Sequence, residues 1–388
     1  MKKIDSTKRY EKLREAVGNG DVDRRTFFGL MGSAAITAGV AGGAMTSMAR
    51  MAHAAGTELH FEGWGGVVSE ALRKYAFAPY EAATGNTVVD ATFGGENEVL
   101  TKIKAAGGTV GHNILHSSGV NWYKRWVDAG YGVSLNEANI PNLANVMTAM
   151  LDPFRKITPD SLSAVPYDYG TTGIAYNTKY ITEAEAKELG ANLLLRKDLK
   201  DKIGGWGGDW ANRAWYGALQ SGQDPNAISD WDAVWDKARE HRDLVLKYWS
   251  SGAELMDLLA KEEIYVTEAW SGRVAALQAQ GHPIAYIDPP NGLAWMESMF
   301  VLKGSPMAEA EELLNFMLDP QTALAVASGQ KYPSSLDPTK VDMPADVQAL
   351  PAFDPTGKLD SLVFRDPEFW NAQEKAQSKQ WNRVSKGA

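Results

Sequence analysis

From residue 58 onward, the spacing of apolar residues changes between the two-residue period of a strand and the longer period of a helix. The segment ELHF has the two-residue period of a short strand, whereas residues 67–83 place Val68, Leu72, Tyr75 and Tyr80 on one side of a helix. This pattern then repeats. It predicts strands at 58–61, 86–93 and 112–116, and helices at 67–83, 96–106 and 121–130. Alternating strands and helices with short loops favour a mostly parallel sheet with helices on both faces.

Two extended segments interrupt this rhythm. SAVPYDYGTTGIAYNT (163–178) carries alternating aromatic residues on both sides of Gly170, and we interpret it as a crossing from one lobe to another. IAYIDPPNG (284–292) is interpreted as the return crossing, because Pro289 and Pro290 are excluded from the interior of a sheet.

A second α/β set is expected between the two crossings. It comprises helices from Trp210, over 230–248 and over 254–261, and a strand at 263–270; after the return come a strand at 294–302 and two helices split at Asp319 and Pro320. We therefore predict two lobes, 55–166 with 290–335 and 167–289 with 336–388.

The first 54 residues form a separate unit. DRRTFFG contains a paired arginine followed by two phenylalanines, a weakly apolar run follows, and AHA (52–54) is a small-x-small site. These features indicate a twin-arginine export signal over residues 1–54, which would make the twin-arginine translocase a partner and the periplasm the destination. A short transmembrane anchor is the alternative, although five glycines interrupt residues 27–49.

Composition narrows the function classes. The chain has 388 residues, 44% hydrophobic and 22% charged, which suits a globular protein with more than one core. Residues 1–54 hold nine of the 39 basic and five of the 48 acidic residues, so the remainder has a formal charge of about −13. Such a surface repels phosphate backbones, so no nucleic-acid partner is expected. The absence of cysteine excludes disulfides and thiolate metal sites.

A series of short motifs carries a resemblance to a known family. The order GWGG, HSSG, VPYDYGTTGIAYN, EAWSG, PIAYIDPPNGLAWMESMFVLKGSP and LLNFMLDPQTALAVASGQKYPSS is similar to periplasmic solute-binding proteins of ABC importers in the polyamine (spermidine/putrescine) group. The resemblance implies an α/β, two-lobe periplasmic binding protein fold (type II) with hinge strands. It also implies a monomer that holds a small-molecule ligand in its cleft and presents it to a membrane permease.

The same resemblance suggests binding residues. Trp64, Trp270 and Trp295 match the tryptophans that line the ligand, Tyr332 a cleft tyrosine, Ser117 a polar contact, and Glu297 an acidic residue that holds an ammonium group. Aromatic faces beside a carboxylate suit an amine. Glu268, two residues before Trp270 on the same predicted strand, is a further candidate. For the tryptophans a place in the core is the alternative, and for Glu297 a solvated position on the strand.

Arg213 departs from the family pattern. It stands in the first turns of the helix after Asp209, which we expect to cap it, and shares a helix face with Trp210. An arginine near a helix N-terminus would bind an anion and repel a diamine. With Glu297 it predicts a zwitterionic ligand, such as a GABA-like ω-amino acid, a betaine or an aminophosphonate. A true polyamine ligand, and a surface salt bridge of Arg213 with Asp209, stay open.

An enzyme and a ferric-ion binder are two other function classes. An enzyme would need a nucleophile or a metal, yet the sequence has no G-x-S-x-G, dinucleotide fingerprint or phosphate loop, and we expect no catalytic residue and no cofactor. His112 and His116 could share a strand face as a metal pair, but no third ligand is nearby in the sequence. A ferric-ion binder would call for paired tyrosines, whereas QKYPSS supplies only one.

Overall fold

The computed structural model describes residues 56–108 and 111–387. The predicted twin-arginine signal at 1–54, with its paired Arg24 and Arg25, lies outside the described residues. Within those described ranges, no helix combines the length and apolar character needed to cross a membrane.

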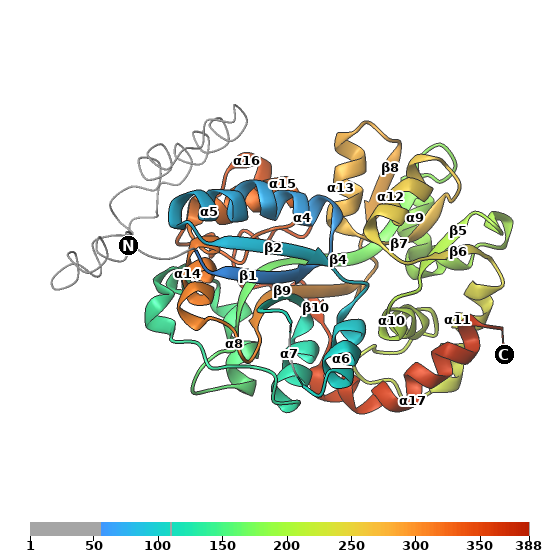
Figure 1. Cartoon of the computed structure of the whole chain (residues 1–388). Coiled ribbons are helices and arrows are strands. Elements are labelled where there is room, and N and C mark those ends of the chain that lie inside the picture. The colour runs from blue at the N-terminus through green and yellow to red at the C-terminus, as the bar shows by residue number, and fades with distance from the viewer. Residues whose placement is uncertain (1–55, 109–110, 388) are drawn as a thin grey trace, which may run out of the picture.

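One continuous sheet runs through the molecule in the strand order β2-β1-β3-β9-β4-β7-β5-β6, with β10 beside β9 and β8 beside β4 (Figure 1). β1, β2 and β3 are mutually parallel, as are β5, β6 and β7. The strands are β1 (Glu58–Gly63), β2 (Thr87–Thr92), β3 (Ile114–Ser118), β4 (Ala164–Asn177), β5 (Ile203–Trp206), β6 (Val245–Trp249), β7 (Val266–Trp270), β8 (Ile284–Ile287), β9 (Leu293–Val301) and β10 (Val363–Phe364).

The first lobe surrounds β1, β2, β3 and β9 with helices from both ends of the chain. A single large apolar cluster includes Phe61, Phe77, Trp126, Phe154 and Phe300, all buried. The helical segments of this lobe are α4 (Gly66–Leu72), η2 (Arg73–Phe77), α5 (Ala78–Thr84), α6 (Glu96–Ala105), α7 (Gly119–Asp128), η3 (Glu137–Asn139), η4 (Pro141–Asn145), α8 (Thr148–Ile157), α14 (Met307–Met317), α15 (Pro320–Gln330) and α16 (Ala345–Gln348). As expected, α14 and α15 are split at Asp319, whose side chain caps α15.

The second lobe contains β5 to β8 and its own apolar clusters. Its helical segments are α9 (Glu183–Leu189), η5 (Gly190–Leu195), η6 (Lys197–Leu199), α10 (Trp210–Gln220), α11 (Trp231–Arg242), α12 (Gly252–Ala260) and α13 (Ser271–Ala279). The helix predicted over 230–248 ends at Arg242, and β6 follows. Residues 245–249 pair in parallel with β5, and this pairing places them in a strand.

β4 carries the chain from one lobe to the other. All 14 of its residues are buried; its first part pairs with β9, and its last part pairs with β7 and β8. Pro289 and Pro290 lie between β8 and β9, as expected for the return crossing. The type II two-lobe α/β fold predicted from the resemblance is thus the fold observed.

The C-terminal segment belongs to both lobes, which differs from the predicted boundary at 336. Leu336, Val347 and Leu350 pack with Leu324 of α15 on the first lobe, because the chain turns back over α15 before it crosses. Only afterwards does α17 (Pro367–Ser385) cross, contacting α7 on one lobe and α10 and α11 on the other (Figure 1).

Candidate functional site

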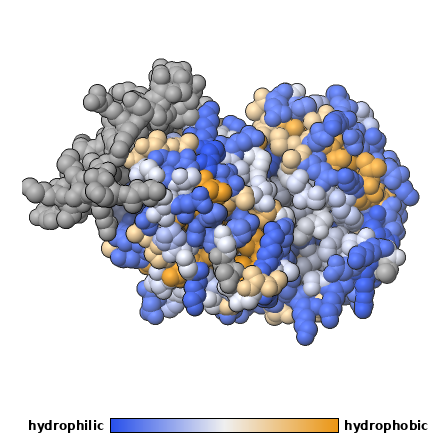
Figure 2. Space-filling view, in the orientation of Figure 1, coloured by the Kyte–Doolittle hydropathy of each residue, from blue (hydrophilic) through white to orange (hydrophobic). Residues whose placement is uncertain are grey.

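A cavity of about 190 Å³ lies between the lobes, where strands of both lobes end. Its lining includes Trp64 after β1, Glu96 after β2, Ser118 at the end of β3, Trp206 at the end of β5 and Trp270 at the end of β7. The outer face of both lobes is largely hydrophilic, and the surface is hollowed between them (Figure 2). Crevices outside the carboxyl ends of strands are the usual ligand sites of α/β folds.

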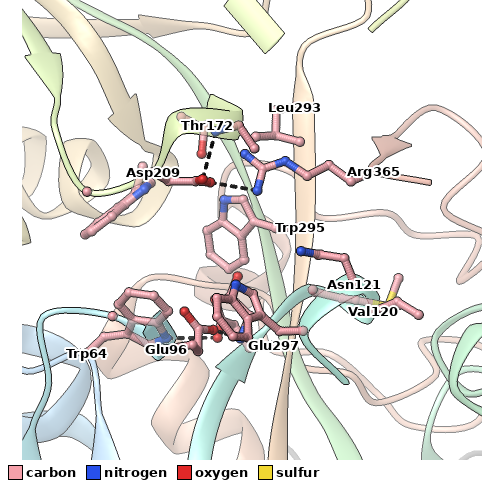
Figure 3. A pocket seen from close by; sticks show the side chains of 18 of the residues that line it. Trp64, Glu96, Val120, Asn121, Thr172, Asp209, Leu293, Trp295, Glu297 and Arg365 are labelled. Carbon is pink, nitrogen blue, oxygen red and sulfur yellow. Dashed lines mark hydrogen bonds and ion pairs between the residues drawn. The ribbon is translucent and has the colours of Figure 1, made fainter. Parts of the chain in front are cut away.

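Three carboxylates meet at the first-lobe end of the cavity. Asp168 of β4 lies directly opposite Glu297 of β9, because a bulge between Pro166 and Asp168 shifts the register by one residue. Glu96, at the first position of α6, lines the cavity beside Glu297 (Figure 3). Like charges opposite one another on adjacent strands are unfavourable, and all three side chains are at most 6% exposed.

Neutral donors partly satisfy these acids. The Trp64 indole N–H donates to Glu297 Oε2 at 2.9 Å, the Ser118 backbone N–H donates to Glu96 Oε1 at 2.6 Å, and the Gln330 amide donates to Asp168 Oδ2 at 2.6 Å. The nearest potential cation is His116, whose Nε2 lies 3.5 Å from Asp168 and 3.8 Å from Glu297. Asp168 Oδ1 is buried without a partner.

Burial dominates the titration of this cluster. Burial raises the pKa of Glu96 to about 7, although the hydrogen bond from the Ser118 backbone N–H has the opposite effect and lowers this pKa. It also holds the pKa of Glu297 well above its ordinary value, and the negative charges of Asp168 and Glu96 add to that rise. A cation bound among the three carboxylates would lower these pKa values, because it favours the ionised form of each acid.

Aromatic side chains form the walls. Trp64 of the first lobe and Trp270 of the second meet edge to face with ring centroids 6.0 Å apart, and Trp295 meets Tyr332 in the same way at 5.0 Å. Gly170 of β4 lies opposite Trp295, and a Cβ there would be 2.7 Å from the indole ring. The absence of a side chain at Gly170 therefore allows Trp295 to lie across β4.

The second-lobe rim is lined by an ion pair and the C-terminal helix. Asp209 caps α10, as expected, and its other carboxylate oxygen pairs with Arg365 Nη1 at 2.7 Å. Trp210 also lines the cavity and donates to Glu374 of α17 at 2.9 Å. In Figure 3 the Asp209–Arg365 pair and the Glu297 end lie on opposite sides of Trp295.

Six of the nine residues predicted for the site line the cavity: Trp64, Trp210, Trp270, Trp295, Glu297 and Tyr332. Arg213 and Glu268 do not. Both are fully buried inside the second lobe, where Arg213 Nη1 lies 3.2 Å from Glu268 Oε1 and Arg213 Nη2 donates to Gln220 at 3.0 Å. The expectation that Arg213 faces the cleft is therefore corrected, and so is the alternative of a surface pair with Asp209.

Ser117 is also absent from the cavity wall. Its hydroxyl is buried and accepts a hydrogen bond from the Trp126 indole at 3.2 Å. Neighbouring residues of a strand point to opposite faces, so His116 and Ser118 reach the cavity while Ser117 points into the first-lobe core.

Sequence reasoning missed Glu96, Asp168, Arg273 and Arg365, all of which line the cavity. Glu96 follows two glycines after a strand, a signal that could have been used. Asp168 depends on a bulge that no residue pattern marks, and Arg365 comes from 68 residues after Glu297 in the chain.

The two histidines considered as a possible metal pair, His112 and His116, have different partners. His112 Nε2 lies 3.2 Å from Glu62, whereas His116 is in the acidic cluster. In the described part of the chain, no three His, Cys, Asp or Glu side chains are arranged to hold a metal ion.

Comparison with known proteins agrees with this architecture. Residues 75–355 match the family model described as bacterial extracellular solute-binding protein. The putrescine-binding periplasmic protein PotF of Escherichia coli K12 is 25% identical over 354 residues, covering 85% of this chain and 91% of PotF. The gamma-aminobutyric acid-binding protein of Pseudomonas aeruginosa PAO1 is 32% identical over 127 residues, covering 32% of this chain and 35% of that protein.

Solved structures share the fold. The crystal structure of the PBP MotA from A. tumefaciens B6, in complex with glucopine, has a TM-score of 0.71 at 20% identity and covers 85% of this chain and 100% of MotA. Family match, relatives and cleft lead to the same conclusion: this chain belongs to the bacterial extracellular solute-binding proteins, as a periplasmic component of an ABC importer.

Proposed function

We propose that the protein captures a small amine-bearing solute between its lobes and delivers it, without chemical turnover, to the membrane permease of an ABC importer. The observation that carries this proposal is the cluster of Glu96, Asp168 and Glu297 in a tryptophan-walled cavity. Among the described residues, no lysine or arginine forms an ion pair with any of these three buried carboxylates, which is unfavourable, and a ligand ammonium supplies the missing charge.

The aromatic walls suit the same ligand. A cation over an indole face gains on the order of 1 kcal/mol or more when it is desolvated, and Trp64, Trp270 and Trp295 surround the space beside Glu297. Because the walls come from both lobes, a bound solute stabilises the closed arrangement of the lobes over the open one.

Among amines, we favour a zwitterion: a GABA-like ω-amino acid, a betaine or an aminophosphonate. Arginine side chains share the cavity with the acids, and a second ammonium group of a diamine would meet them. Arg213 is buried against Glu268, away from the cavity wall, and does not contact such a ligand. Relatives are named for putrescine and for gamma-aminobutyric acid, so a polyamine ligand is the alternative to be tested.

A thermal-shift screen followed by titration calorimetry tests the proposal. The protein is mixed with diamines, spermidine, ω-amino acids, betaines and aminophosphonates, and we expect at least one amine-bearing compound to raise the melting temperature and to bind without being consumed. Glu297→Gln should weaken that binding about 30-fold or more, because it removes a desolvated carboxylate from the ammonium group.

Glu183→Gln is the matched control, since Glu183 is exposed on α9, outside the cavity, and pairs with Lys187 of the same helix. It should bind as the unmodified protein does. If no amine-bearing compound stabilises the protein, or if Glu297→Gln binds as well as the control, the proposed function is wrong.

A further inference from the structure

Arg273 is a buried cation at the cavity wall without a counter-ion. It is only 2% exposed, and its guanidinium carbon lies 5.8 Å from the Trp270 ring centroid and 6.0 Å from that of Tyr332. Its Nη2 donates weakly to the Gly65 carbonyl of the opposite lobe at 3.4 Å, while Nη1 is buried without a partner. Across residues 56–108 and 111–387, no carboxylate lies within salt-bridge distance of it.

The surroundings of Arg273 add positive potential. It is the third residue of α13, and Trp270 at the N-cap position provides no side-chain cap for the first turn. The helix dipole favours a negative charge at this end of α13, where the Tyr332 ring packs against Gly272 of the same turn. A buried guanidinium at this end of a helix is therefore doubly unfavourable until an anion joins it.

Arg365 is a weaker candidate for the same role. It also lines the cavity, and its Nε and Nη2 lack partners, but its charge is already balanced by Asp209 at 2.7 Å. Of these two arginines at the cavity, only Arg273 lacks an acidic partner.

Arg273 and the acidic cluster lie near the same side chain, Tyr332. The pKa of the Tyr332 phenol is raised to about 12, chiefly by burial; Arg273 opposes the rise, and Asp168 and Glu297 contribute to it. Tyr332 packs against Trp295, which lies two residues before Glu297 on β9, and the Arg273 guanidinium carbon lies 6.0 Å from the Tyr332 ring centroid. This wall therefore has a positive site and a negative site beside it. A short molecule with opposite charges at its ends would satisfy both.

We infer that the Arg273 side chain, at the N-terminal end of α13, forms the subsite for the anionic end of the solute. The ligand class is then an ω-amino acid or a close analogue, with its carboxylate at Arg273 and its amine at Glu297. This inference rests on the proposed function and makes it more specific: the same cavity that accepts one amine selects against a second one.

The sharpest test uses the unmodified protein and ligands that differ at one end only. For chains of three to six carbons, calorimetry compares each ω-amino acid with the diamine and with the ω-amino amide of the same length. We expect the best ω-amino acid to bind about 100-fold more tightly than its amide or its diamine, the usual effect of losing one partner of a buried charge pair.

Variants assign the effect to Arg273. Arg273→Gln should weaken ω-amino acid binding about 100-fold and leave diamine binding equal or stronger, whereas Arg273→Lys should retain a part of the ω-amino acid affinity. Arg242→Gln, on the surface at the end of α11 and outside the cavity, is the matched control. Circular dichroism checks that each variant is folded. If Arg273→Gln does not fold, the comparison of ω-amino acids, amides and diamines on the unmodified protein tests the inference by itself.

The failures are distinguishable. If diamines or amides bind as tightly as ω-amino acids, the anion subsite is wrong while amine capture stands. If Arg365→Gln abolishes discrimination and Arg273→Gln keeps it, the assignment to Arg273 is wrong. If none of the three compound classes binds, the proposed function fails together with this inference.

Discussion

Single residues in this protein differ in whether their buried charge is balanced within the protein. Arg213 and Glu268 balance each other inside the second lobe, and burial raises the pKa of Glu268 while Arg213 opposes that rise. Among the described residues, Arg273 has no such partner, and His116 is the one basic side chain within ion-pair distance of the cavity acids. A buried charge that is paired within the protein needs no ligand, whereas an unbalanced charge in a cavity is available to one.

The Arg213–Glu268 pair should affect stability and not ligand binding. Arg213→Met alone leaves a buried carboxylate and should lower the free energy of unfolding by about 3 kcal/mol, whereas Arg213→Met with Glu268→Leu should recover most of that loss. Urea denaturation of both variants measures this. Ligand affinity of the folded variants should change less than about threefold; a larger loss at unchanged stability would return Arg213 to the binding site.

At the scale of elements, the pairing of β4 with β9 builds most of the ligand wall. The bulge after Pro166 brings Asp168 opposite Glu297, and two residues farther along Gly170 lies opposite Trp295. The two strands thus place an acidic pair and an aromatic face side by side, on the segment that also joins the lobes. A shift of β4 relative to β9 would therefore disturb both the ligand-binding wall and the segment that joins the lobes.

Gly170→Ala should demonstrate this dependence. Its Cβ would meet the Trp295 ring at 2.7 Å and Tyr332 at 3.1 Å, so the wall must shift. We expect about 1–3 kcal/mol lower stability and about tenfold weaker ligand binding. Gly111→Ala is the control, because no described residue beyond its chain neighbours has an atom within 4 Å of the added methyl group. Equal ligand affinity in the two variants, measured by calorimetry, would contradict a role of Trp295 in the wall.

At the scale of the whole molecule, three segments connect the lobes: β4, the return before β9, and α17. Glu374 of α17 accepts hydrogen bonds from Trp210 of the second lobe and, at 3.4 Å, from Arg125 of the first lobe. The acids between the lobes oppose this arrangement when they are ionised without a cation. The stability of the ligand-free molecule should therefore depend on pH.

The direction of that dependence follows from Glu96. Its pKa is about 7 in the folded protein and near 4.5 when it is exposed, so the folded state binds more protons between these values. Its contribution to stability is full below about pH 4.5 and is lost as the pH rises to about 7, a change on the order of 3 kcal/mol. Relative to the unmodified protein, Glu96→Gln should become more stable over this range.

Denaturation at a series of pH values measures the effect. The difference between Glu96→Gln and the unmodified protein isolates one group from the many acids that titrate in the same range. A saturating amine ligand should reduce the loss in the unmodified protein, because its charge favours the ionised carboxylate. A pH-independent difference between the two proteins would show that Glu96 titrates normally.

The order of strands and helices, the two crossings and most of the aromatic wall could be predicted from the sequence, because each depends on local spacing or on a resemblance that spans the chain. Trp64, Trp270, Trp295, Glu297 and Tyr332 were found this way and line the cavity. The strand at 245–249 could not be distinguished from the end of a helix, because only its pairing with β5 decides it.

What the sequence determined by itself is therefore the two-lobe α/β architecture and the kinds of side chain that line the cleft. The tertiary structure decided which charges reach the cleft. Arg213 and Arg273 are both arginines in the first turns of helices, yet Glu268 from a neighbouring strand neutralises the first, and no carboxylate of the described residues pairs with the second. Whether a buried charge is neutralised depends on residues from distant parts of the chain, so a local sequence pattern cannot predict it.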